Sequence, residues 1–159
     1  MYLMGIDVGT SGVKVIVLSE EGKLMADQSS SYPISSPFPS WFEQNPEDWW
    51  TATVDCIRKI ISHNTINPSE IRGIGLSGMY HGLVLLDRDC NVIRPCILWN
   101  DQRTAAQSEY ISRKIGDERI LRIAATSCAP YFTACKLIWV RDNEPENYEK
   151  IYKCMLPKD

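Results

Sequence analysis

Carboxylate, hydroxyl and glycine residues gather near the start of the chain in Asp7-Val8-Gly9-Thr10-Ser11-Gly12, and Lys14 follows just beyond. Glycines let backbone N–H groups approach a ligand closely, and N–H groups together with hydroxyls can bind phosphate oxygens. A carboxylate beside them can hold a hydrated divalent cation. These residue types favour a nucleotide-phosphate loop, but an ordinary tight hairpin uses the same residues, and both interpretations stay open here.

Apolar runs rich in β-branched residues flank this stretch on both sides and predict a hairpin over residues 2–18. A weaker pattern predicts a third strand over residues 23–32. Asn45 as N-cap and Pro46 in the first turn predict the start of a helix that should end near His63. Its apolar face, which should pack on the sheet, contains Trp49, Thr53, Cys56, Ile57, Ile60 and Ile61.

The second half of the chain predicts further short elements. We expect strands at 71–77 and 82–86, an extended run at 92–98, helices at 102–115, 134–141 and 145–153, and a loop at 126–133. Asp101 can cap the helix that begins at residue 102, and Gly116 can end it. A meander followed by a crossover helix gives a mixed sheet, antiparallel first and parallel where the helix returns. The fold class is therefore α/β.

One motif matches a known fingerprint in its letters but not in its structural context. Gly73, Gly75 and Gly78 match the dinucleotide fingerprint G-x-G-x-x-G letter for letter. That fingerprint requires the glycines after a strand and at the start of a helix. Here they overlap a predicted strand and more strand follows, so we reject a dinucleotide site.

Two further clusters could bind a small polar ligand. After the strand that ends in glycines come Tyr80 and His81, where an imidazole could bond a polyol and an aromatic ring could pack on its carbon face. The alternative is a tight turn with a surface histidine. Asn100, Asp101 and Arg103 lie at a strand-to-helix junction, where an internal Asp–Arg pair is the simpler interpretation. The aromatic residues at 41–42 could form a lid, but a loop plug is the favoured interpretation.

Composition excludes several classes of protein. The 159 residues suit one domain, and the net charge of −3 without a Lys/Arg cluster disfavours a nucleic-acid or membrane surface. No apolar run approaches the roughly 20 residues of a membrane span, and no signal peptide is recognisable, so we expect a cytoplasmic protein. Six cysteines without a C-x-x-C pair, and only two histidines, disfavour zinc and predict free thiols.

Taken together, these segments resemble the N-terminal part of FGGY-family carbohydrate kinases, and most closely xylulokinases. The resemblance is carried, in order, by residues 5–11, 41–50, 75–82, 97–103, 132–140 and 155–159. It implies the actin/hexokinase-like ATPase fold, with a ribonuclease H-like mixed sheet flanked by helices. It also implies ATP- and Mg²⁺-dependent phosphorylation of a sugar hydroxyl, with D-xylulose to D-xylulose 5-phosphate as the leading case.

The resemblance also implies residue roles. Asp7 would lie near Mg²⁺ and the γ-phosphate. The ATP phosphates would be bound by Gly9, Thr10, Ser11 and Lys14, and the sugar by Tyr80, His81, Asn100, Asp101 and Arg103. The expected partners are a small-molecule sugar and ATP, together with a possible second copy of the chain in a homodimer.

The sequence departs from the family pattern in two places. Many xylulokinases have Gln-Met before the His-Gly pair, whereas this chain has Met79-Tyr80, which affects the sugar contact directly. The family's general-base Asp and its C-terminal ATP-binding domain lie beyond Asp159. We therefore expect residues 1–159 to be an incomplete N-terminal domain, inactive by itself. The alternatives are a kinase for ribulose, gluconate or glycerol, and a non-catalytic actin-like ATP-binding module.

Overall fold

The computed structural model describes residues 1–62 and 66–159. Two compact units divide the chain. The first contains residues 1–34, 45–79 and Lys158, and the second contains residues 35–44, 80–157 and Asp159. Each unit is described by itself below.

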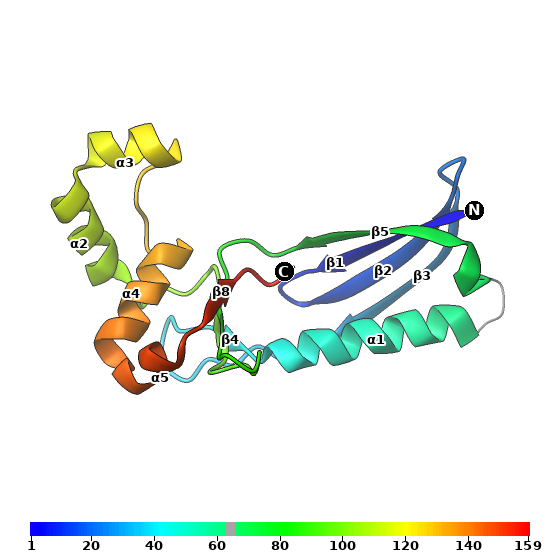
Figure 1. The fold of residues 1–159 in the computed structure, drawn as a ribbon, viewed down its shortest axis with the longest axis horizontal. Coiled ribbons are helices and arrows are strands. Elements are labelled where there is room, and N and C mark those ends of the chain that lie inside the picture. Colours follow the sequence, from blue (N-terminus) through cyan, green and yellow to red (C-terminus); the bar gives the residue numbers. More distant parts are fainter. Residues whose placement is uncertain (63–65) are drawn as a thin grey trace. The chain divides into compact units, whose positions relative to one another are not determined.

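The first unit is built on a four-stranded sheet with the order β3-β2-β1-β5 (Figure 1). Its strands are β1 (Tyr2–Val8), β2 (Gly12–Ser19), β3 (Leu24–Ser31) and β5 (Ile71–Gly78). The first three form an antiparallel meander, and β5 pairs with β1 in parallel. Since a parallel pair requires a crossover connection, helix α1 (Pro46–Ser62) and the short 3-10 turn η1 (Pro68–Glu70) occupy the intervening chain. The predicted mixed sheet is confirmed.

Helix α1 covers one face of this sheet (Figure 1). The Asn45 side chain accepts a hydrogen bond from the Glu47 N–H at 3.2 Å, as expected of an N-cap. Of the six residues expected on its apolar face, Ile57 and Ile61 are only half-buried. The buried set in the helix is Trp49, Ala52, Thr53, Cys56 and Ile60, facing Met4, Ile6, Val8, Val13, Val15 and Val17 of the sheet. The predicted helix end at His63 lies outside the described residues.

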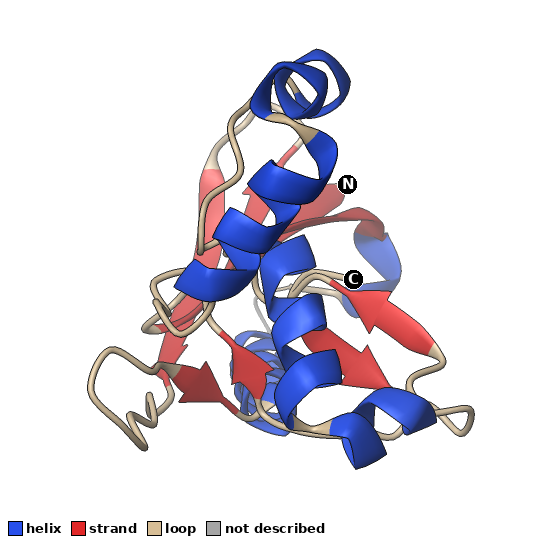
Figure 2. Ribbon diagram, turned by 90° about the vertical axis from the view of Figure 1, so that its left-hand side faces the viewer, coloured by secondary structure: helices blue, strands red, loops and turns tan. Residues whose placement is uncertain are grey.

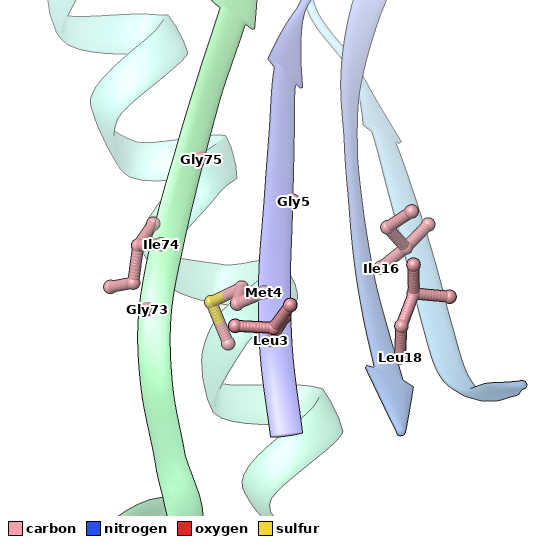
Figure 3. A pocket seen from close by; sticks show the side chains of 8 residues that line it. All are labelled: Leu3, Met4, Gly5, Ile16, Leu18, Gly73, Ile74 and Gly75. Carbon is pink, nitrogen blue, oxygen red and sulfur yellow. The ribbon is translucent and has the colours of Figure 1, made fainter. Parts of the chain in front are cut away.

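The opposite face of the sheet carries a shallow apolar hollow (Figure 3). Leu3, Ile16 and Leu18 project around it, and Gly5, Gly73 and Gly75 form its floor because they lack side chains. All three glycines of the G-x-G-x-x-G motif lie within β5, so the strand interpretation is confirmed and the dinucleotide fingerprint is excluded. β5 is also an edge strand of this sheet.

The second unit combines short antiparallel strand pairs with helices (Figure 2). Strand β4 (Glu43–Gln44) pairs with β7 (Cys96–Ile97), and β6 (Val84–Leu86) pairs with β8 (Lys153–Met155). The helices are α2 (Ala105–Ile115), α3 (Asp117–Ala124), α4 (Thr133–Asn143) and α5 (Pro145–Lys150). The core is Leu83, Leu85, Ile97, Trp139 and Val140. Trp41 packs on this core, with its ring 5.3 Å from that of Trp139, which confirms the loop plug.

Several sequence expectations for this unit need correction. Helix α2 begins at Ala105 instead of Gln102, and Asp101 does not cap it because its carboxylate is bound to Arg103 and to the Phe42 N–H. Residues 117–124 form a helix that the sequence analysis did not predict. The strand expected at 82–86 begins only at 84, and the helix expected over 145–153 ends at 150, because residues 153–155 pair with β6. Gly116 ends α2 as predicted, but its φ of 87° and ψ of 135° lie outside the left-handed helical conformation expected of this glycine.

All six cysteines lie within the described residues and are free thiols. None of the helices in the described part of the chain has the length and apolar character of a membrane span.

Candidate functional site

The loop between β1 and β2 is held in a tight turn. The Gly9 N–H donates to the Gly12 carbonyl at 3.0 Å, and the Tyr32 hydroxyl donates to the Gly9 carbonyl. A Cβ atom at Gly12 would lie 2.5 Å from the Ser30 carbonyl oxygen, so no larger residue fits there without moving the backbone. The turn that carries Thr10 and Ser11 is therefore fixed by its neighbours as well as by its own sequence.

Beside this loop, an ammonium, a carboxylate and a hydroxyl form a row across three strands. Asp7 of β1 is exposed and is paired in register with Lys14 of β2 and with Ser77 of β5. Residues paired in register point to the same face of a sheet. The Lys14 Nζ lies 3.4 Å from the carboxylate of Asp27, and about half of each side chain is exposed. Such surface pairs contribute little to stability, so this ammonium can exchange its partner for a phosphate at small cost.

Hydroxyl groups line the adjoining hollow. Its volume is about 340 Å³, and its lining includes Asp7, Ser11, Lys14 and the serines at 29–31. Burial and the negative charge of Asp7 raise the pKa of Tyr32 to about 12, so the phenol keeps its proton and stays a donor. Sequence reasoning missed Tyr32 and the three serines. The signal was a run of hydroxyl residues at the end of the third predicted strand.

The chemistry of the loop fits a nucleotide-bound Mg²⁺ better than a cage made by protein alone. Mg²⁺ keeps several waters and is usually held by one or two carboxylates plus substrate phosphates. Asp7 supplies one exposed carboxylate, beside the loop hydroxyls. In the described part of the chain, no group of three or more His, Cys, Asp or Glu residues could hold a metal ion.

The second unit contains an aromatic pocket of about 410 Å³, within the usual range of roughly 300–1,000 Å³ for small-ligand sites. It is lined by Tyr80, His81, Trp99, Thr126, Tyr131 and Phe132. The His81 ring lies 4.7 Å from the rings of Tyr80 and Phe132 and 5.5 Å from that of Tyr131. A polar imidazole is thus surrounded by aromatic faces, as recognition of a polyol would require.

His81 has an unusual backbone and an altered proton affinity. Its φ is 58°, a left-handed conformation that non-glycine residues rarely adopt. Burial lowers the pKa of His81, and the positive charge of Lys136 lowers it further. A neutral imidazole can both donate and accept a hydrogen bond, which suits a hydroxyl group. The next residue must be glycine, because a Cβ atom at Gly82 would lie 2.6 Å from Pro157 Cγ.

Asp101 and Arg103 form the internal ion pair that the simpler interpretation expected. Arg103 Nη2 lies 2.7 Å from Asp101 Oδ2, and Arg103 Nη1 lies 2.7 Å from Glu43 Oε1. Both side chains are almost fully buried, and the Asp101 carboxylate also accepts from the Phe42 N–H at 2.7 Å. Asn100 differs, because its Oδ1 is buried without a hydrogen-bond partner among the described residues.

The expected site residues thus form two groups. The residues expected on the phosphate side, Asp7, Gly9, Thr10, Ser11 and Lys14, lie in the first unit. The residues expected on the sugar side, Tyr80, His81, Asn100, Asp101 and Arg103, lie in the second unit.

Comparison with known proteins assigns the chain to a family. The profile of the FGGY family of carbohydrate kinases, N-terminal domain, matches residues 2–159. The chain belongs to this family. This FGGY domain is 42% identical to the xylulose kinase of Bacillus subtilis over 158 residues and 42% identical to that of Escherichia coli over 159 residues. These alignments cover 99% and 100% of the chain and 32% of each relative.

A solved structure confirms the fold of the FGGY domain. A xylulose kinase from Brucella ovis superposes with a TM-score of 0.93 at 38% identity, covering 100% of this chain and 33% of that protein. The actin/hexokinase-like fold expected from the sequence is therefore confirmed. The chain spans about a third of the length of the curated relatives it matches.

Sequence reasoning did not single out three residues that line the aromatic pocket of this FGGY domain, namely Thr126, Tyr131 and Phe132. Trp99 also lines the pocket, and it directly precedes the predicted Asn100–Arg103 cluster. Phe132 lay within a segment that carried the family resemblance. Tyr131 and Thr126 lay in a stretch interpreted only as a loop, and an aromatic pair in a loop between two helices was the available signal.

Proposed function

We propose that this FGGY domain is the sugar-binding part of an ATP-dependent kinase that converts D-xylulose into D-xylulose 5-phosphate. The observation that carries the proposal is the aromatic pocket around a neutral His81, in a chain with 42% identity to xylulose kinases. A ketose presents hydroxyl groups on a weakly polar carbon chain. Imidazole and aromatic rings match both parts of such a ligand.

In this proposal, His81 bonds a sugar hydroxyl while the rings of Tyr80 and Trp99, 5.4 Å apart, contact the carbon chain. The unpartnered Oδ1 of Asn100 accepts a bond from a second hydroxyl, which would remove the cost of burying it alone. Asp101 and Arg103 act indirectly, by fixing the strand-to-helix junction that carries Trp99. The Tyr80 position is where selectivity between ketoses would be decided.

On the phosphate side, Gly9, Thr10, Ser11 and Lys14 would bind ATP phosphate oxygens through N–H, hydroxyl and ammonium groups. Asp7 would hold Mg²⁺ through water, and the ion supplies charge neutralisation for the transferred phosphoryl group. The sugar oxygen forms a bond to the γ-phosphorus, the bond to the ADP oxygen breaks, and the hydroxyl proton goes to a base. Among the described residues, the lining of the aromatic pocket includes no carboxylate, so a carboxylate base would lie outside that lining.

The test is a coupled ADP-release assay with ATP, Mg²⁺ and a panel of D-xylulose, ribulose, gluconate and glycerol. It is run on this chain and on its reading frame extended past Asp159. We expect D-xylulose to be the best substrate of the longer protein and the chain alone to show little turnover. Preference for another member of the panel would reassign the substrate, and ATP binding without turnover of any sugar would favour the non-catalytic module.

A further inference from the structure

Lys136 in α4 is a buried cation to which the proposed reaction gives no role. Its side chain is fully buried. Its Nζ donates to the backbone carbonyl of His81 and, at 2.8 Å, to that of Tyr131. His81 and Tyr131 both line the aromatic pocket and come from separate segments of the chain. One ammonium therefore joins two parts of the pocket wall.

Burying this ammonium is costly, because neither hydrogen-bond partner carries a negative charge. The titratable and charged groups that face it are His81, Cys96, Cys135, Asp101 and Arg103. Asp101 is already bound to Arg103 and to the Phe42 N–H, and Arg103 opposes the charge. Burial lowers the pKa of Lys136 to about 8. An apolar side chain of similar length would fill the same space without this cost.

The contact with His81 falls on a residue whose backbone conformation is unfavourable. A left-handed conformation is strained at a non-glycine residue and persists only when its surroundings enforce it. The ammonium bond holds the His81 carbonyl in that conformation. The peptide orientation in turn fixes where the imidazole sits among the rings of Tyr80, Tyr131 and Phe132.

We infer that Lys136 is a positioning residue for the sugar pocket: its ammonium fixes the His81 and Tyr131 carbonyls and so sets the imidazole in place. The inference rests on the proposed function only for the identity of the ligand. The geometry of the Lys136 contacts is independent of that function, because it concerns only residues of this domain. The positive charge of Lys136 also contributes to the lowered pKa of His81, which keeps the ring neutral.

The experiment compares Lys136→Met and Lys136→Arg with Lys114→Met, an exposed lysine of α2 that serves as the matched control. The His81 ring is followed by NMR titration in a His63→Gln background, since the chain has only two histidines. D-xylulose binding is followed in the same samples. We expect Lys136→Met to raise the pKa of His81, to broaden or shift its ring signals, and to weaken sugar binding about tenfold or more.

Lys136→Arg keeps the charge and two donors, so it should retain the low pKa of His81 and recover part of the affinity. Lys114→Met should change none of these quantities. Unchanged ring signals, pKa and affinity in a folded Lys136→Met would overturn the inference. If that variant does not fold, Lys136→Gln replaces it, because a neutral side chain must still raise the pKa of His81.

The two proposals fail in different ways. If D-xylulose does not bind the unmodified domain but Lys136→Met still moves the His81 pKa and ring signals, then the ligand is wrong and the positioning role stands. If D-xylulose binds the unmodified domain and Lys136→Met equally well, with His81 unmoved, then the positioning role is wrong and the sugar assignment stands.

Discussion

The guanidinium of Arg103 stacks over the indole ring of Trp41, 3.8 Å from its centre, while its nitrogens bind the carboxylate of Asp101. A planar cation is needed for both contacts at once, since a lysine ammonium has neither a flat face to stack on an indole ring nor a rigid fork of donors that matches a carboxylate. The plug formed by Trp41 and the junction that carries Asn100 are therefore held by the same side chain. This contact links the edge of the pocket to the core of the second unit.

Arg103→Lys should destabilise the second unit by about 3 kcal/mol, because it breaks a buried ion pair and leaves the Asp101 carboxylate poorly compensated. Urea unfolding followed by tryptophan fluorescence measures the change. Arg141→Lys is the control, since the Arg141–Asp142 pair is exposed. Equal stability of the two variants would show that the buried pair contributes nothing beyond a surface one.

Gly82→Ala should cost about 1–3 kcal/mol, because the added methyl group would overlap Pro157. The β6–β8 pairing lies close by in sequence and should loosen with it. Thermal unfolding and amide exchange at 153–155 report the effect. Gly75→Ala is the matched control, since a Cβ atom there meets no atom within 4 Å. If Gly82→Ala left the unfolding free energy unchanged, Pro157 would be able to move aside without cost.

Tyr32→Phe should loosen the phosphate loop, because it removes the bond to the Gly9 carbonyl without changing the packed ring. We expect a loss of about 1 kcal/mol in unfolding free energy and faster amide exchange at residues 9–11. Tyr2→Phe, in β1 of the same unit, serves as the control. If amide exchange at residues 9–11 did not change in Tyr32→Phe, the backbone turn alone would hold the loop in place.

The stability of the chain should depend on Lys136 in alkaline solution. Its folded pKa of about 8 lies below the ordinary value of 10.5, so between these values the unfolded chain binds more protons than the folded one. This group therefore increases stability as pH rises from about 8 to 10.5. The pH dependence of the unfolding free energy should lose this component in Lys136→Met, and identical curves would contradict the lowered pKa.

Cys96 should act in the opposite direction. Burial raises the pKa of its thiol from 9.0 to about 12, so above pH 9 the unfolded chain loses a proton that the folded chain keeps. Stability falls as pH rises through this window. Cys96→Ala should reduce the fall, and Cys90→Ala, at an exposed thiol, should not. The measurement is the same alkaline series of denaturant curves.

We expect the domain to associate through the edge strand β5. This strand exposes Ile74 and Leu76, and exposed apolar edge strands tend to pair with strands of other molecules. Sedimentation velocity should show concentration-dependent association that Leu76→Lys reduces. Leu121→Lys, on α3, is the control. A monomer at all concentrations would contradict both this prediction and the homodimer considered from the sequence.

Local signals were sufficient for the first unit. The Gly9–Gly12 turn and the Asn45 cap each determine structure within a few residues, and both appear as predicted. The apolar spacing of α1 placed Trp49, Thr53, Cys56 and Ile60 in the core, but not Ile57 and Ile61. Rejection of the G-x-G-x-x-G motif also held, because its glycines alternate with apolar residues in the manner of a strand. The fold of the first unit could therefore be predicted from interactions between residues close in sequence.

The second unit depended on contacts that the sequence does not display. Residues 153–155 are extended because β6 lies beside them. Asp101 does not cap α2 because its carboxylate binds Arg103 and the Phe42 N–H. The pocket could be predicted only as far as His81 and its neighbours. Tyr131 joins it through Lys136, a lysine whose burial nothing in the local pattern indicated.

The pairing of β6 with β8 has a consequence for biosynthesis. The strands of the first sheet are complete once residue 78 has left the ribosome, whereas β6 must wait for residues 153–155. At roughly 5–20 residues per second, that interval is on the order of 4 to 15 seconds. During it, Leu83 and Leu85 lack the neighbours that bury them in the finished protein. During synthesis, the second unit should therefore expose these apolar side chains until residues 153–155 emerge and pair with β6.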